Sequence, residues 1–243
     1  MDADELLDLA GDPRFIEGIY NYCDRWCERC PFTSRCLVYA TEEAEGDADR
    51  DLSNEAFWRS MQAIFEQTRE LIERLAAEQG IDLEAIDKET IIEEKRQKRK
   101  RVRKDSLTKA AERYVRMVEE WFKGENAIIE RVSRSEAADY FQVIRWYQFQ
   151  IAVKIMRGLS GREQAERSDG QKDSDGSVKV ALIGIDRSIG AWGELQKIFP
   201  DKAASIAPIL IHLEQMRRKA EQAFPQARNF LRPGFDFMPD VLH

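Results

Sequence analysis

Turn-forming residues are scarce in this chain of 243 residues, which contains only 13 Gly and 7 Pro. A β-sandwich needs a turn about every 8 to 12 residues, and a collagen-like chain needs glycine at every third position, so both classes are excluded. Hydrophobic residues make up 43% and charged residues 34% of the chain. This balance is typical of helices, and the length is sufficient for a buried core in one or two domains.

Long apolar runs are also absent. The longest aliphatic stretch covers residues 206–211, which are six residues that include Pro208, whereas a membrane helix needs about 20. The N-terminus, MDADELLDLAGD, is acidic where an export signal would be basic and then apolar. We therefore expect no membrane span and a cytoplasmic location. The net charge of −7 gives no overall attraction to nucleic acid.

Helical periodicity and helix-end signals predict an all-α fold, a multi-helix bundle. The expected helices cover residues 13–30, 53–79, 135–159, 178–199 and 203–224, with a shorter helical stretch around 37–38. The Gly- and Pro-free segment 81–122 is expected to form two helices joined at Asp105-Ser106. No repeat and no alternation of strands with helices is present, which excludes a solenoid and an α/β fold.

Composition divides the chain into three parts. Residues 1–52 are expected to be a Cys-rich, metal-binding helical element that packs on the bundle, and residues 53–225 are expected to be the bundle itself. Within the bundle, residues 160–177 contain a single apolar residue, Ala165, which predicts a mobile loop. Residues 226–243 are expected to form an irregular tail whose Phe230, Phe235 and Phe237 pack against the rest of the protein.

Cysteine is confined to one short window with the spacing C-x3-C-x2-C-x5-C. The four residues are Cys23, Cys27, Cys30 and Cys36. On the predicted helix 13–30, the first three share a sector of about 60° with apolar residues, while Asp24 and Arg25 lie on the opposite side. The spacing therefore predicts thiols that converge toward the core.

Four interpretations of this cluster are open. A disulfide is disfavoured because cytosolic thiols are kept reduced. A single zinc ion needs its sulfurs within about 4 Å of each other, yet Cys23 and Cys30 would be separated by about 10.5 Å of helical rise. A [4Fe–4S] cluster accepts more widely spaced thiolates, and Cys30-Pro31 matches the proline that follows a ligand in bacterial ferredoxins. The fourth interpretation is a purely structural set of buried cysteines.

The triplet Cys23, Cys27 and Cys30 is also similar to the C-x3-C-x2-C motif of radical-SAM enzymes. That family places its motif after a barrel strand, with repeating strand and helix units and a glycine-rich cofactor site. None of these features is present in this sequence, so we assign no family. We expect an iron–sulfur protein in which all four cysteines bind a [4Fe–4S] cluster for electron transfer or redox sensing with an unknown partner. The alternative is a zinc-stabilised or thiol-lined scaffold that recruits a protein or nucleic acid.

Two other sets of residues are candidates for function. Residues 95–104, KRQKRKRVRK, contain eight basic residues but no aromatic residue, and an acidic block precedes them, so we expect only weak binding of nucleic acid. Arg145, Asp186 and His212 are isolated ionisable residues in apolar helices. We expect Arg145 to pair with Asp186 and His212 to be a hydrogen-bonded core residue, with a small-molecule pocket as the less favoured interpretation.

Overall fold

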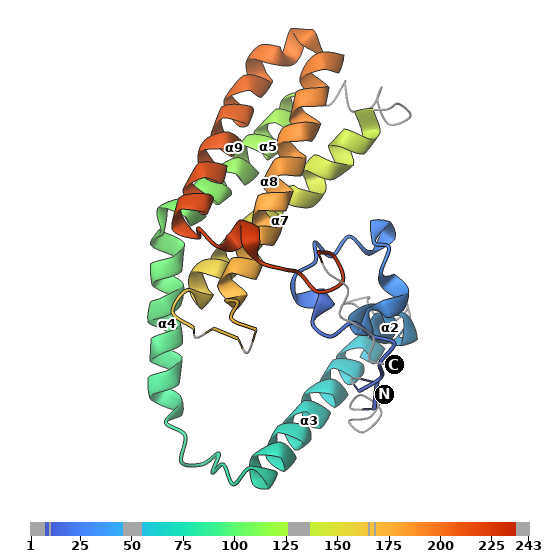
Figure 1. Ribbon diagram of the computed structural model, residues 1–243, viewed down its shortest axis with the longest axis vertical. Coiled ribbons are helices and arrows are strands. Elements are labelled where there is room, and N and C mark those ends of the chain that lie inside the picture. Colours follow the sequence, from blue (N-terminus) through green and yellow to red (C-terminus); the bar gives the residue numbers. More distant parts are fainter. Residues whose placement is uncertain are drawn as a thin grey trace. The chain divides into compact units, whose positions relative to one another are not determined.

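The structure, a computed structural model, describes residues 8–9, 11–45, 55–125, 137–164, 166–167 and 169–236 (Figure 1). These residues are helical or irregular, and no β-strand lies among them, so the all-α prediction is confirmed. None of the described helices is both long and apolar enough to cross a bilayer. The α-helices are α2 (Leu37–Glu45), α3 (Glu55–Glu78), α4 (Lys88–Lys104), α5 (Ser106–Gly124), α7 (Ala137–Gly161), α8 (Asp173–Ile198) and α9 (Ala203–Ala223).

The chain forms two compact units that interleave along the sequence. The first contains residues 1–20, 27–94 and 233–243, and the second contains residues 21–26 and 95–232. The second unit is a four-helix bundle in which α7 packs on α5 and α8, and α9 also packs on α5 and α8 (Figure 1). Each of the four helices therefore buries an apolar face against two neighbours, which is the arrangement that a bundle requires.

Aromatic side chains fill the core of the bundle at one level. The rings of Trp121 and Trp192 meet edge to face with centroids 4.9 Å apart, and Phe122 meets Phe141 in the same way at 5.4 Å. The indole of Trp192 donates to the hydroxyl of Tyr114 at 3.3 Å, which satisfies a buried polar group. These contacts connect α5, α7 and α8 through residues distant in sequence.

The boundary between α4 and α5 lies where the sequence predicts it. The side chain of Asp105 accepts a hydrogen bond from the backbone N–H of Leu107 at 2.7 Å, which caps α5 at its N-terminus. The prediction of two helices joined at Asp105-Ser106 is therefore confirmed. The starts expected at residues 53 and 135 lie outside the described residues.

The helix expected over residues 13–30 is wrong. Only two short 3-10 turns form in this region, η1 (Ile19–Asn21) and η2 (Cys27–Arg29), and a third, η3 (Thr33–Arg35), follows it. The backbone is left-handed at Gly18, where φ is 72°, and at Arg25, where φ is 56°. A single residue with positive φ ends a right-handed helix, so two of them divide this stretch into turns.

The loop before α8 is shorter than expected. Helix α7 continues to Gly161 and α8 begins at Asp173, five residues before the expected start at Val178. Acidic residues favour the first turn of a helix because they face its positive end, and Asp173 and Asp175 occupy that turn. Low apolar content therefore did not prevent residues 173–177 from being helical.

The C-terminal tail packs down as expected where it is described. Phe230 is buried and contacts Tyr22 with ring centroids 4.6 Å apart in the second unit. Phe235 meets Phe32 edge to face at 5.1 Å in the first unit. Phe237 lies outside the described residues.

Gly176 allows Tyr22 and Phe230 to approach the surface of α8. A Cβ atom at position 176 would lie 2.5 Å from the ring of Tyr22 and 2.6 Å from that of Phe230. We expect Gly176→Ala to lower the free energy of unfolding by about 1–3 kcal/mol because two packed rings must move. Urea denaturation measures this change.

The matched control is Gly193→Ala in the same helix, where a Cβ atom has no neighbour within 4 Å. Alanine has the higher helix propensity, so this variant should be neutral or more stable by up to about 1 kcal/mol. Equal destabilisation by both substitutions would show that the two rings do not pack on α8.

Candidate metal-binding segment

None of the four cysteines forms a disulfide, and each is partly buried. Cys23 belongs to the hexapeptide 21–26, which is part of the second unit, whereas the other three belong to the first unit. Cys27 begins η2, Cys30 directly follows it, and Cys36 precedes α2. The turns, rather than one helix face, therefore position the thiols.

Two of the sulfur atoms accept a hydrogen bond from the backbone two residues further along. The N–H of Phe32 donates to Sγ of Cys30 at 3.5 Å, and the N–H of Arg25 donates to the thiol of Cys23. A backbone N–H aimed at sulfur favours its negatively charged form. Cys23 and Cys30 therefore already have part of the environment that a thiolate ligand needs.

The described residues do not form a ready metal site. No group of three or more His, Cys, Asp or Glu side chains among them is arranged to hold a metal ion. The expected helix face, on which three cysteines would share a sector of about 60°, does not exist, because turns replace the helix. Because no helix forms here, Cys23 and Cys30 are not separated by a helical rise, which was the reason that a single zinc ion was disfavoured.

The hexapeptide 21–26 docks on the bundle through the carboxylate of Asp24. This carboxylate accepts hydrogen bonds from the hydroxyl of Tyr147 and from the guanidinium of Arg187, the latter at 2.7 Å. Arg187 also donates to the Tyr147 hydroxyl. Burial, followed by the neighbouring Asp24, raises the pKa of Tyr147, so the phenol stays protonated and acts as a donor to the carboxylate.

A stacked pair of indoles supports the same docking. The rings of Trp26 and Trp146 lie nearly parallel, with centroids 4.9 Å apart and an interplanar angle of 17°. The Nε1–H of Trp146 donates to the backbone carbonyl of Asp24 at 2.9 Å. Side chains of both α7 and α8 thus contact the hexapeptide at Asp24, and α7 also contacts it at Trp26.

Cys23 lies in this docked hexapeptide beside a buried lysine. Burial raises the pKa of the Cys23 thiol, and the Arg25 N–H and the charge of Lys154 partly offset that effect. Lys154 is buried in α7 and donates to the carbonyl of Asn21 at 3.2 Å, and burial lowers its pKa. A positive charge beside Cys23 reduces the cost of a thiolate at this position.

A second anchor lies at the start of the hexapeptide. The hydroxyl of Tyr22 donates to Asp173 at 2.7 Å and accepts a hydrogen bond from Arg167. Burial, together with the contact to Asp173, raises the pKa of Tyr22 to about 12. The segment that carries Cys23 is therefore attached to the loop before α8 as well as to the bundle.

Sequence reasoning missed the residues that make this docking. It placed Asp24 on the outer side of a helix, yet the Asp24 side chain is only 21% exposed and forms an ion pair. The available signal was the isolated charges Lys154 and Arg187 in otherwise apolar helices. Such charges require a partner, but nothing in the sequence indicated a partner more than 130 residues away.

The expected pair of Arg145 and Asp186 does not form, and that prediction is wrong. Asp186 instead bonds Arg228 at 2.6 Å and Arg217 at 3.3 Å, both from the C-terminal part of the bundle. Arg145 is exposed and places its guanidinium over the ring of Phe122, 3.9 Å from the centroid. The aromatic face satisfies this cation without a carboxylate.

His212 is a hydrogen-bonded residue, as the sequence predicts. Its Nε2–H donates to the carbonyl of Ala110 at 2.8 Å, which joins α9 to α5. Burial lowers the pKa of His212, and the charges of Arg113 and Lys219 lower it further, against the opposing effect of the Ala110 carbonyl. The ring is therefore a neutral donor at physiological pH.

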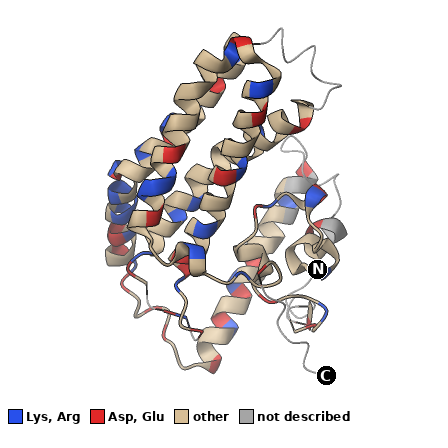
Figure 2. Cartoon of the chain, turned by 45° about the horizontal axis from the view of Figure 1, so that its top comes forward, with Lys and Arg blue, Asp and Glu red and all other residues tan. Residues whose placement is uncertain are grey.

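The basic run lies on the second half of α4, and Figure 2 colours its Lys and Arg residues blue. The side chains of this run are mostly exposed. Asp87 accepts a hydrogen bond from the N–H of Thr90 at 3.0 Å at the start of α4, and Arg101, Arg103 and Lys104 lie in the last turn. Acidic groups at the start and basic groups at the end complement the helix dipole. This segregation gives the charge pattern a structural role without any nucleic acid.

Comparison of the chain with protein-family models, with curated proteins and with solved structures finds no match.

Asp24 provides the first test of the docking. We expect Asp24→Ala to lower the free energy of unfolding by about 2 kcal/mol, because it leaves the buried hydroxyl of Tyr147 without its acceptor. The control Glu194→Ala removes an exposed carboxylate that pairs with Lys197 on α8, and it should cost less than about 0.5 kcal/mol.

A double-mutant cycle then isolates the Asp24 contact. Tyr147→Phe should cost less in the Asp24→Ala background than in the native protein, because the hydroxyl no longer has an acceptor to lose. Additive effects of the two substitutions, measured by urea denaturation, would contradict the hydrogen bond.

His212 gives a pH dependence with a defined sign. The pKa of His212 is lowered on folding, so its favourable contribution to stability is fully present above its ordinary pKa near 6.5. That contribution is lost as the pH falls below 6.5 and through the lowered pKa of the folded state. His212→Gln keeps an N–H donor for Ala110 but does not titrate. Between about pH 7.5 and 5.5, the urea midpoint of this variant should fall less than that of the native protein. Parallel midpoints would contradict the assignment.

Proposed function

We propose that Cys23, Cys27, Cys30 and Cys36 together bind a [4Fe–4S] cluster, through which the protein transfers electrons or senses oxidation. The observation that carries this proposal is the confinement of every cysteine of a 243-residue chain to 14 consecutive positions, with none of the four in a disulfide. Consecutive cysteines are three to six residues apart, a spacing at which one short segment can supply all the ligands of a cluster.

The hydrogen bonds to sulfur support a thiolate role. Backbone N–H groups already face Cys23 and Cys30, and such bonds stabilise the charge on cluster ligands and raise the reduction potential. Burial acts in the opposite direction, since a low dielectric disfavours the more negative reduced state. The balance between these two effects would set the potential of a bound cluster.

Cluster binding requires the backbone around residues 27–36 to rearrange, because the described thiols are not gathered into one site. This segment consists of three-residue turns, so little regular structure opposes the change. Metal binding is commonly coupled to folding of the ligand segment, and the free energy of binding then orders it. Free thiols also suit a reducing compartment, and the cytoplasm is the location that we propose.

Zinc is the alternative occupant, and one observation favours it. The objection that Cys23 and Cys30 are separated by two helical turns no longer applies, because residues 13–30 do not form a helix. A tetrahedral zinc site with four thiolates would make the protein a zinc-stabilised scaffold for a protein or nucleic-acid partner. Such a site would stabilise the segment but would have no redox activity.

Elemental analysis distinguishes the two occupants. After anaerobic purification of the full chain, we expect about four iron and four acid-labile sulfide ions per chain, with broad absorption near about 400 nm. One zinc ion without sulfide would support the alternative instead. Absence of iron, sulfide and zinc after reconstitution would refute both.

Single Cys→Ser substitutions test the ligand set. Each of the four should lower the bound metal by more than about half, because loss of one thiolate opens the site. Ser34→Ala is the control, since it changes an exposed residue of the same segment and removes no thiol. Full metal retention in Cys36→Ser would remove Cys36 from the ligand set and leave an open coordination position.

A further inference from the structure

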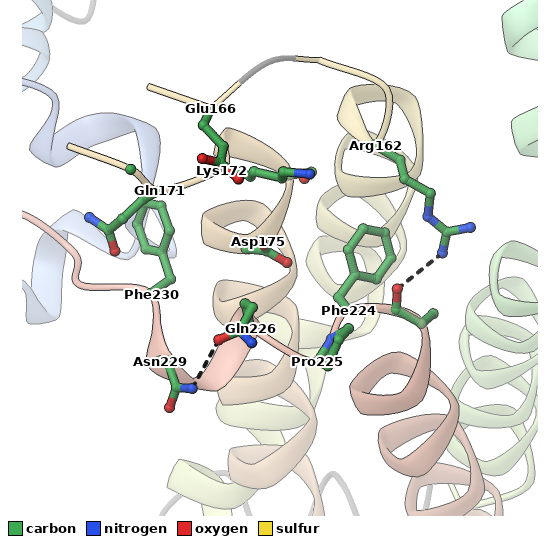
Figure 3. A pocket seen from close by; sticks show the side chains of 13 residues that line it. Arg162, Glu166, Gln171, Lys172, Asp175, Phe224, Pro225, Gln226, Asn229 and Phe230 are labelled. Atoms are coloured by element: carbon green, nitrogen blue, oxygen red, sulfur yellow. Dashed lines mark hydrogen bonds between the residues drawn. The ribbon is translucent and has the colours of Figure 1, made fainter. Parts of the chain in front are cut away.

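A pocket of about 440 Å³ lies in the second unit, beside the start of α8 (Figure 3). Its walls come from the end of α7, the loop after it, the first turn of α8 and the segment that follows α9. The volume is in the range of pockets that bind small molecules. Its lining includes Arg162, Lys172, Asp175, Phe224, Gln226 and Phe230.

The carboxylate of Asp175 is the unusual feature of this pocket. Asp175 is only 9% exposed, yet its side chain forms no hydrogen bond or ion pair with any residue that the structure describes. Burial raises the pKa of Asp175, and the charge of Lys172 only partly offsets this effect. A carboxylate that is partly shielded from solvent and has no protein donor is disfavoured, and a ligand that supplies donors would compensate for this.

Aromatic rings flank this carboxylate. Figure 3 shows Asp175 between Phe230 on one side and Phe224 on the other. The ring of Phe230 is held in place by Tyr22, and Gln171 accepts a hydrogen bond from the N–H of Leu231 at 2.6 Å. These contacts fix the wall that carries Phe230 before any ligand enters, so the site is largely preformed.

Positive charge lies at the mouth of the pocket. The guanidinium of Arg162 lies over the ring of Phe224, 4.6 Å from the centroid, and donates to the carbonyl of Ala223 at 3.4 Å. Lys172, directly before α8, provides a second cation, and its side chain lies above Asp175 in the view of Figure 3. Both can contact an anionic group of a ligand whose other end reaches the carboxylate.

We infer that this pocket binds a small molecule that carries a planar, forked pair of N–H donors together with an anionic group. The two oxygens of Asp175 match two parallel N–H donors, as in the bidentate pairing of a guanidinium with a carboxylate. Arg162 and Lys172 bind the anionic group, and the side-chain amide of Gln226 adds polar lining.

Guanidino amino acids and guanine nucleotides share this chemistry, and calorimetric titration of the full chain separates them. The probes are L-arginine with its decarboxylated form agmatine, and guanosine 5′-monophosphate with guanosine. Within the pair that binds, the compound that carries an anionic group, L-arginine or guanosine 5′-monophosphate, should bind at least about tenfold more tightly. Only that compound can contact Arg162 and Lys172 through its anionic group. If none of the four binds at about 10 mM, the inference is overturned.

Two variants test the named contacts. Asp175→Asn keeps the shape of the side chain and should weaken binding of both members of the pair by at least about tenfold. Arg162→Gln should weaken binding only of the compound that carries the anionic group. Unchanged binding by Asp175→Asn, or equal weakening of both members by Arg162→Gln, would overturn the inference.

The control is Asp201→Asn, which makes the same change at a carboxylate that is 72% exposed and lies outside the pocket lining. Asp175→Asn removes a poorly solvated charge but also a favourable charge in the first turn of α8, so its melting temperature should stay within about 4 °C of that of the native protein. Lost binding is then not a consequence of unfolding. The pocket contains no cysteine, so these outcomes do not depend on the metal centre.

Discussion

The carboxylate of Asp24 holds the hexapeptide 21–26, which carries Cys23, to the bundle. It accepts hydrogen bonds from Tyr147 on α7 and Arg187 on α8, and the stacked indoles of Trp26 and Trp146 lie beside it. Cys23 precedes Asp24 directly, so this contact determines the surroundings of one thiol, including the nearby charge of Lys154. An irregular segment with few backbone hydrogen bonds of its own depends on such side-chain anchors for order.

The helices of the bundle were predictable from the sequence because their signals are local. Apolar spacing, the Asp105 cap and the glycines in the last turn of α7 all act within a few residues of the element that they define. The segment 13–30 has similar apolar spacing, but Gly18 and Arg25 adopt left-handed conformations that end any helix. A glycine in the sequence suggests a left-handed residue, whereas an arginine does not. Tertiary contacts therefore determined the backbone conformation of this segment.

The candidate site was predictable in composition but not in environment. The spacing of the cysteines is visible in the sequence, whereas the partners of Asp24 are 123 and 163 residues away. For the same reason Arg145 was paired wrongly: an aromatic face satisfies it, and two arginines from distant positions satisfy Asp186. The Asp175 pocket was also missed, because a loop expected to be mobile contributes its lining.

The interleaving of the two units has a consequence for synthesis of the chain. The hexapeptide 21–26 leaves the ribosome early, but its docking surface is complete only after α8 has been made, since Arg187 lies 163 residues beyond Asp24. Native contacts of such long range form late, because closing the intervening loop costs entropy before any contact compensates for it. Throughout that interval Cys23 lacks the burial that docking gives it, so its thiol is open to oxidation unless the surroundings are reducing.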